Sequence, residues 1–260
     1  MEKFSPLKQE AANQILNIYR YEISEWNDFK LGIACFDYDQ DGRKYTEMMN
    51  GLTATLDYAG SLPNSNIVLD LGTGTGRGCA DLAKQFKNLT FIGTGLRRYP
   101  ETKRFLSGGK FILTCGENLG IKDESIAGVI ANSSITYSHA QQLIAKRIDE
   151  ALVPGGIVKA TFLFSPEKQP NLKLYRQEKI ILDLTKPRDH KEFETAMLAM
   201  GYDLEVKPIF FPDGVNVRRY ILLAIKPGNL SSFSAKEILD KDLQLMFPKE
   251  KIKRWIKKIF

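Results

Sequence analysis

The chain has 260 residues, 43% hydrophobic and 26% charged, which is the balance of a soluble globular protein with a sizeable core. The formal net charge is +6, but residues 249–260 alone hold six cations and one glutamate, a local charge of +5. The rest of the chain carries only +1, so a globally basic surface for nucleic acid is not indicated.

The cysteines and the N-terminal residues indicate a compartment. Cys35, Cys79 and Cys115 lie far apart in the sequence and lack the spacing of a metal site. A sparse, odd set argues against a disulfide framework and for a reducing environment. Residues 1–6 show no apolar segment of a secretion signal, and no apolar run is long enough to span a bilayer. We therefore expect a cytoplasmic protein, with peripheral membrane contact left open.

Two helices are predicted before the first strand. Apolar residues recur at helical spacing over 7–30, inside a predicted helical cap of residues 1–44 that either covers the ligand site or packs on the sheet. Residues 37–42 resemble the start of a calcium loop, but Met48 stands where such a loop needs glutamate, so we interpret them as a solvated turn. A second helix is predicted over 44–60.

The segment Ile67–Gly78 organises the predicted fold. A short apolar run ends at Asp70, Gly72, Gly74 and Gly76 follow, and a helical pattern begins near Cys79. This order of strand, glycine-rich turn and helix is the arrangement in which a nucleotide-like ligand lies against backbone amides. Glycine is needed there because a Cβ would block either the turn or the close approach of the ligand.

Further strands and helices alternate along the chain. Strands are predicted over 89–95, 111–114, 127–131 and 157–164, and helices over 140–152, 174–184 and 191–200. The proline and glycines of 153–156 are expected to separate the first of these helices from its strand, and 202–211 with 215–225 to form a hairpin. The pattern predicts a Rossmann-like α/β fold: a seven-stranded, mainly parallel sheet with helices on both faces and an antiparallel terminal hairpin.

Three segments resemble the class I S-adenosylmethionine-dependent methyltransferases, in particular the small-molecule type related to ubiquinone and sterol enzymes. They are 68–76, 117–126 and 152–156, and the resemblance covers residues 45–226, leaving 227–260 as a helical basic tail. The resemblance implies S-adenosylmethionine as cofactor and a small-molecule or lipid-like acceptor. It places the cofactor site at Asp70, Gly72, Thr73, Gly74, Gly76, Gly95, Leu96, Glu117, Asn118 and Asn132.

The chain departs from the family at three carboxylates. Gly95 stands where the family has the acid that accepts the ribose hydroxyls, Cys115 where it has the acid that contacts adenine, and Ala127 where it has the aspartate before the fourth strand. The lost ribose acceptor alone would weaken binding by about 1.5–3 kcal/mol, or about ten- to a hundredfold. A non-catalytic binding or scaffold protein of the same fold is therefore the alternative function.

Arg97 and Arg98 suggest a further alternative. In dinucleotide folds a small residue followed by arginine can accept a 2′-phosphate, so an NADP-dependent oxidoreductase is a minor hypothesis. The glycine spacing opposes it, because the third glycine of that motif would fall at Arg77 or Cys79. A solvated start of a helix is the plainer role for the two arginines.

The acceptor side is expected just after the fourth strand, over residues 132–139. Methyl transfer from a sulfonium needs mainly alignment and exclusion of water. His139 and Tyr137 are the catalytic candidates for taking a proton from the acceptor, although His139 could simply open the next helix. His190 falls in a polar loop with no recognisable partner. No metal site is predicted.

The last twelve residues form a predicted amphipathic helix. One face holds Ile252, Trp255, Ile256, Ile259 and Phe260, and the cations lie around the others. Such a helix suits an anionic membrane surface or an acidic groove on a partner protein. Docking on its own domain, with a solvated basic face, explains the pattern equally well.

Overall fold

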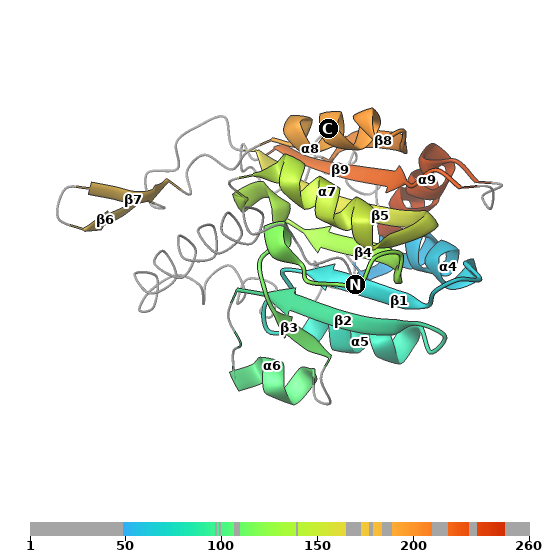
Figure 1. Cartoon of the computed structure of the whole chain (residues 1–260), viewed down its shortest axis with the longest axis horizontal. Helices are drawn as coiled ribbons and strands as arrows, with labels where there is room; N and C mark the ends of the chain where they lie inside the picture. Colours follow the sequence, from blue (N-terminus) through green and yellow to red (C-terminus); the bar gives the residue numbers. More distant parts are fainter. Residues whose placement is uncertain are drawn as a thin grey trace, which may run out of the picture.

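The computed structural model describes residues 49–96, 98, 100–106, 110–138, 140–164, 173–176, 179–183, 189–209, 218–228 and 233–247. Its main element is a seven-stranded sheet with the strand order β3-β2-β1-β4-β5-β9-β8 (Figure 1). The strands are β1 (Ile67–Leu71), β2 (Thr90–Gly95), β3 (Phe111–Leu113), β4 (Ile126–Asn132), β5 (Leu152–Phe164), β8 (Asp203–Ile209) and β9 (Arg218–Ile225).

Strand direction follows the prediction from sequence. The pairs β1·β2, β2·β3, β1·β4 and β4·β5 are parallel, whereas β9 is antiparallel to both β5 and β8. The one antiparallel strand is thus the second from the edge, and β8 forms the edge itself. The α/β fold with a mainly parallel seven-stranded sheet and an antiparallel terminal pair is confirmed.

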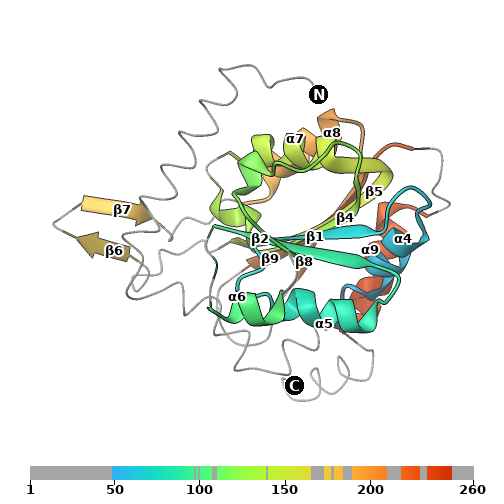
Figure 2. The ribbon, with the colours of Figure 1, turned by 60° about the horizontal axis from the view of Figure 1, so that its bottom comes forward.

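Helices cover both faces of this sheet (Figure 2). Helices α4 (Thr53–Ser61), α5 (Arg77–Gln85) and α9 (Ala235–Met246) bury their apolar residues against one face. Helices α7 (Gln141–Ala151) and α8 (Lys191–Ala199) bury theirs against the other. The short helix α6 (Pro100–Phe105) joins β2 to β3, and two single turns, η1 (Gly116–Asn118) and η2 (Ile135–Tyr137), follow β3 and β4.

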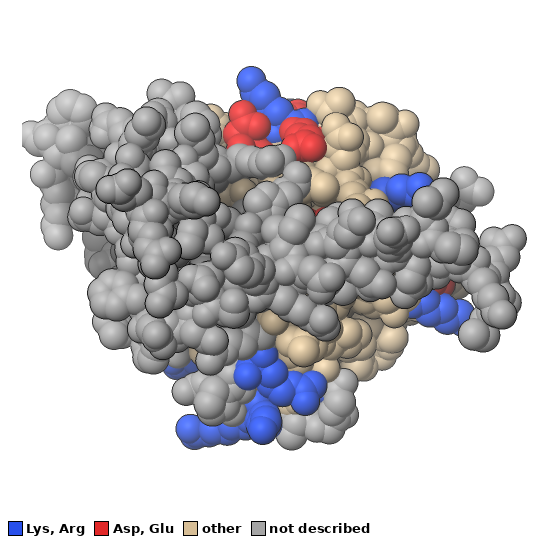
Figure 3. Space-filling view, turned by 60° about the vertical axis from the view of Figure 1, so that its left-hand side comes forward, with Lys and Arg blue, Asp and Glu red and all other residues tan. Residues whose placement is uncertain are grey.

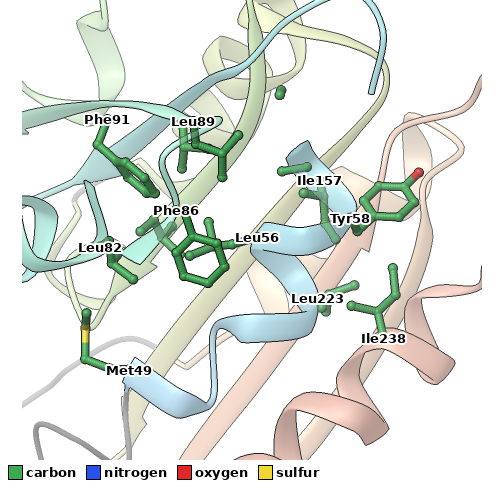
Figure 4. Close-up of a cluster of buried hydrophobic side chains, with 14 of the residues drawn as sticks. Met49, Leu56, Tyr58, Leu82, Phe86, Leu89, Phe91, Ile157, Leu223 and Ile238 are labelled. Carbon is green, nitrogen blue, oxygen red and sulfur yellow. The ribbon is translucent and has the colours of Figure 1, made fainter. Parts of the chain in front are cut away.

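Apolar side chains hold α4 against the sheet and against its neighbouring helices. Leu56 of α4 is 1% exposed and lies beside Phe86 from the end of α5, while Ile157 of β5 and Ile238 of α9 lie on the other side of α4 (Figure 4). At about 25 cal/mol per Å² of apolar surface, each such side chain contributes about 1.5–3 kcal/mol. Helix α4 is therefore held by its apolar stripe. The residue at its N-cap position, Leu52, supplies no capping hydrogen bond from its side chain.

Two local predictions are wrong. The strand predicted at 157–164 already begins at Leu152, because the chain turns directly from α7 into β5 and Leu152 pairs with Ile126 before the glycines. A helix was predicted over residues 174–184, but the described residues there belong to an antiparallel pair of strands, β6 (Lys173–Arg176) and β7 (Lys179–Asp183). Aromatic and β-branched residues favour this pairing, and Tyr175 lies opposite Ile180.

Three of the predicted segments lie where the structure gives no description. The N-terminal helix 7–30, the turn 37–42 and the basic tail 249–260 lie outside the described residues. Helix α4, over 53–61, overlaps the second half of the helix predicted over 44–60. The domain boundaries after residues 44 and 226 stay predictions. Within the described part of the chain, no helix has the length and apolar character to cross a membrane.

Candidate functional site

The strand order creates a switch point between β1 and β4. From β1 the chain moves outward to β2 and β3, and then returns to the other side of β1 to form β4. In open parallel sheets, ligands bind outside the carboxyl ends of the strands at such a point. The loop after β1 leads to α5 on one face of the sheet and the loop after β4 to α7 on the other, so the residues of these two loops define the candidate site.

The glycine loop after β1 takes the backbone shape that only glycine adopts readily. Gly72, Gly74 and Gly76 have φ angles of +77°, +58° and +84°. A Cβ on Gly72 would lie 2.5 Å from the Cβ of Ser134, in the loop after β4. Glycine therefore serves two purposes at position 72: it permits the left-handed turn and lets the β1 and β4 loops touch.

Hydrogen bonds from Thr73 hold this loop against β1 and β2. The amide of Thr73 donates to the carbonyl of Thr94 at 2.8 Å, and the Thr73 hydroxyl donates to Oδ2 of Asp70 at 2.6 Å. The Gly76 amide then donates back to Thr73 O, and α5 starts at Arg77. The predicted order of strand, carboxylate, glycine turn and helix is confirmed, with the helix starting two residues before Cys79.

Burial governs the ionisation of Asp70. Loss of solvent raises the pKa of this carboxyl from 3.8 to about 6, although the hydrogen bond from Thr73 opposes the shift. A raised pKa means that the ionised carboxylate is destabilised in the fold, so the stability contribution of Asp70 decreases as pH rises from about 4 through 6. A cation bound nearby would offset this penalty.

Asp70→Asn is expected to raise the free energy of unfolding of the free protein by about 1–3 kcal/mol at pH 7.5. The gain should shrink steadily as the pH is lowered toward 4.5, because wild-type Asp70 then becomes protonated. Urea denaturation across this pH range measures it. A variant that is less stable than wild type at pH 7.5 would contradict the assigned direction.

The loop after β4 holds buried polar atoms that the described chain leaves unsatisfied. The hydroxyl oxygens of Ser133 and Ser134 and Oε1 of Gln141 are buried without a hydrogen-bond partner among the described residues. Ser133 also has a φ of +59°, a strained value for serine. Buried polar atoms are nearly always paired, so the partners of these three oxygens lie outside the described side chains. Asn132, the predicted contact at the end of β4, directly precedes them.

The turn η1 places a buried acid next to the same loop. Glu117 is 1% exposed, and its Oε1 accepts a hydrogen bond from the Ser138 hydroxyl at 2.6 Å. Asn118 follows it, and its carbonyl accepts from the Thr114 hydroxyl. Cys115, which stands in place of the family's adenine-contacting acid, is buried, and burial raises the pKa of its thiol to about 11. This position therefore presents a neutral thiol.

The end of β2 also lacks its usual acid. Gly95 is the last residue of β2, and its carbonyl accepts a hydrogen bond from the Thr114 amide. Leu96 follows with 40% of its surface exposed. Arg98 donates from Nη2 to the carbonyl of Phe111 at 3.3 Å, and its guanidinium lies over the Phe111 ring. No carboxylate occurs over residues 94–96 to bind the ribose hydroxyls.

The predicted catalytic pair is only partly placed. Tyr137 ends η2, while its side chain and His139 lie outside the described residues. His190, expected in a loop without a partner, instead precedes α8 with its ring between Phe162 and Tyr220 and with Nε2 3.3 Å from Glu194. Burial lowers its pKa. The described residues contain no cluster of acidic, histidine or cysteine side chains suited to a metal ion.

The comparisons agree with this geometry. Residues 69–159, which run from β1 into β5, match the family model described as "Methyltransferase domain". This part of the chain is similar to a methyltransferase domain. The resemblance to class I S-adenosylmethionine-dependent methyltransferases is thereby confirmed. A search of curated protein sequences finds no significant match.

Solved structures share the fold of this chain at low identity. The [4+2]-cyclase SpnF matches with a TM-score of 0.51 and 17% identity, over 69% of this chain and 81% of that one. Phosphoethanolamine N-methyltransferase 2 of Haemonchus contortus matches at 0.51 and 16%, over 68% and 52%. A putative methyltransferase of Listeria monocytogenes matches at 0.50 and 15%, over 68% and 98%. At these identities the likeness concerns the fold alone.

Proposed function

We propose that this chain binds S-adenosylmethionine at the carboxyl ends of β1, β2 and β4 and transfers its methyl group to a small or lipid-like acceptor. The observation that carries the proposal is the pairing of two loops at the switch point. One contributes three left-handed glycines, and the other contributes buried serine hydroxyls that have no partner among the described residues. The match to a methyltransferase domain over the same residues supports this cofactor.

The residues fit the polar parts of such a cofactor. Asp70 would bind a cationic group, and the backbone of Gly72–Gly76 would lie against the methionine and ribose portions. Ser133 and Ser134 would supply the hydrogen bonds that their buried oxygens now lack. The sulfonium brings an activated methyl group, so the protein's work is to align the acceptor and exclude water.

The missing acids make weak binding the expected behaviour. With Gly95 and Cys115 in place of the family's carboxylates, the affinity for S-adenosylmethionine should be about ten- to a hundredfold below that of a relative that has them. This departure is also the observation that favours the alternative function, a non-catalytic binding protein. The [4+2]-cyclase among the similar structures supports the wider point that this fold is not restricted to methyl transfer.

Calorimetry with S-adenosylmethionine and S-adenosylhomocysteine tests the proposal. We expect binding at submillimolar to millimolar ligand, a loss of at least about tenfold in Asp70→Asn, and no change in Asp57→Asn, a control at an exposed position on α4. Neither heat nor a thermal shift at millimolar ligand would overturn it. Heat with NADPH alone would instead favour the oxidoreductase hypothesis, in which Arg98 would have to leave Phe111.

A further inference from the structure

A basic surface lies beside the candidate site, at the β3 edge of the sheet. We define the α6 patch as the cations Arg98, Lys103, Arg104 and Lys110 together with Leu96 and Leu113. All four cations are exposed, and the leucines are exposed by 40% and 60%. Large hydrophobic side chains with this exposure are uncommon in the described chain, and two of the five lie here.

The topology brings these residues together. Gly95 of β2 pairs with Leu113 of β3, so Leu96 and Leu113 lie at neighbouring strand ends. Arg98 is held against β3 by Phe111, and Lys110 directly precedes that strand. Lys103 and Arg104 occupy the last turn of α6, which connects the two strands. The patch is therefore built on α6 and on the ends of β2 and β3.

The charge of the α6 patch is uncompensated among the described side chains. None of its four cations forms an ion pair with a described acidic residue, whereas other surface cations do, such as Lys84 with Asp81. Figure 3 shows blue side chains gathered at the lower end of the face turned to the viewer, with no red among them in that view. This surface suits a polyanionic partner.

We propose that the α6 patch binds the surface of an anionic lipid bilayer. Cations beside exposed aliphatic side chains are the combination that binds such a surface, because the cations attract anionic headgroups while the leucines enter the interface. Nucleic acid fits less well: it is bound by cations together with stacking aromatic rings, and the exposed apolar side chains that the structure describes in the patch are leucines.

The α6 patch lies next to the candidate cofactor site. Leu96 directly follows Gly95, the β2 terminus of the candidate cofactor site, so a bilayer bound here would lie next to that site. An acceptor dissolved in the bilayer would reach the site without crossing bulk water. This last step rests on the proposed function, whereas bilayer binding itself does not.

Vesicle co-sedimentation of the full chain tests the proposal, with phosphatidylcholine vesicles that contain or lack phosphatidylglycerol. We expect binding only to the anionic vesicles, and weaker binding at high salt. Lys103→Glu/Arg104→Glu/Lys110→Glu should reduce binding at least about 100-fold, at about fivefold per cation removed. Leu96→Ser/Leu113→Ser should reduce it about tenfold. Arg98 is retained because it packs on Phe111.

The matched control is Lys146→Glu/Lys191→Glu/Lys236→Glu, which makes the same change in net charge at exposed positions on α7, α8 and α9. It should retain most of the binding. Equal losses in the two triple variants, or no loss in either because another segment such as 249–260 carries all the binding, would overturn the proposal. So would patch-dependent binding of an RNA oligomer without vesicle binding. Calorimetry with S-adenosylmethionine on the same variants separates failure of this proposal from failure of the proposed function.

Discussion

Lys159→Ala is expected to lower the free energy of unfolding by about 3–5 kcal/mol, among the largest effects of any single substitution in this fold. Lys159 is 5% exposed in the middle of β5, and its Nζ lies 2.6 Å from Oδ2 of Asp242, which is fully buried on α9. Its Nζ also donates to the carbonyl of Gly51. Removing the amine leaves the Asp242 carboxylate buried without its counter-charge.

Asp242 also completes α4. Its Oδ1 accepts from the Ala54 amide at 2.7 Å and its Oδ2 from the Thr55 hydroxyl at 2.5 Å, so a residue of α9 caps a helix that lacks a cap of its own. The ion pair thus ties α4, β5 and α9 together. Burial lowers the pKa of Lys159, and Asp242 opposes that shift.

A double-mutant cycle in urea measures this coupling. Lys159→Met and Asp242→Leu should each lose several kcal/mol, but the double variant should lose far less than their sum, about 1–2 kcal/mol, most of it from the missing α4 cap. Lys146→Ala, at an exposed position on α7, is the control and should change stability by less than about 0.5 kcal/mol. Additive losses in the double variant would refute the coupling.

Gly72→Ala is expected to lower stability by about 2–4 kcal/mol and to abolish measurable binding of S-adenosylmethionine. The φ of +77° costs alanine about 1 kcal/mol, and the new Cβ, 2.5 Å from that of Ser134, must displace the β4 loop. Both loops of the candidate site are then disturbed. Binding is measured by calorimetry at a temperature where the variant remains folded.

Two other glycines distinguish the backbone penalty of a left-handed φ from the steric clash of a new Cβ. Gly120 has a φ of +58° but open space around its missing Cβ, so Gly120→Ala should lose only the backbone penalty of about 1 kcal/mol. Gly78 lies in α5, also with open space and without a left-handed φ, so Gly78→Ala should stabilise by about 0.5–1 kcal/mol. Cofactor binding unchanged in Gly72→Ala would remove the glycine loop from the site.

Local patterns were sufficient for the first half of the candidate site. The apolar run ending at Asp70, the spaced glycines and the helix that follows are consecutive, so their chemistry can be read without knowing the fold. The same applies to the β4 strand and its position after 117–126. In contrast, the unsatisfied oxygens of Ser133 and Ser134 were not predictable, because a hydroxyl's partners depend on the whole surrounding structure.

Contacts between distant residues explain what the sequence did not reveal. Lys159 and Asp242 are 83 positions apart, and nothing near either residue marks them as a pair. His190 was predicted to lie in a polar loop without a recognisable partner, because its ring partners Phe162 and Tyr220 come from β5 and β9. Helix α9 did have a local signal: Ser234 and Glu237 form a capping box, the S-x-x-E pattern that starts a helix.

The place of β9 in the sheet has a consequence for biosynthesis. β9 pairs with β5 on one side and β8 on the other, although both precede it in the chain. While the protein is being synthesised, β5 therefore lacks its second neighbouring strand, and β8 lacks any neighbour, until residue 225 has left the ribosome. Open strand edges pair readily with other chains. The nascent protein should be most dependent on chaperones in this interval, which ends when β9 inserts and α9 can place Asp242 against Lys159.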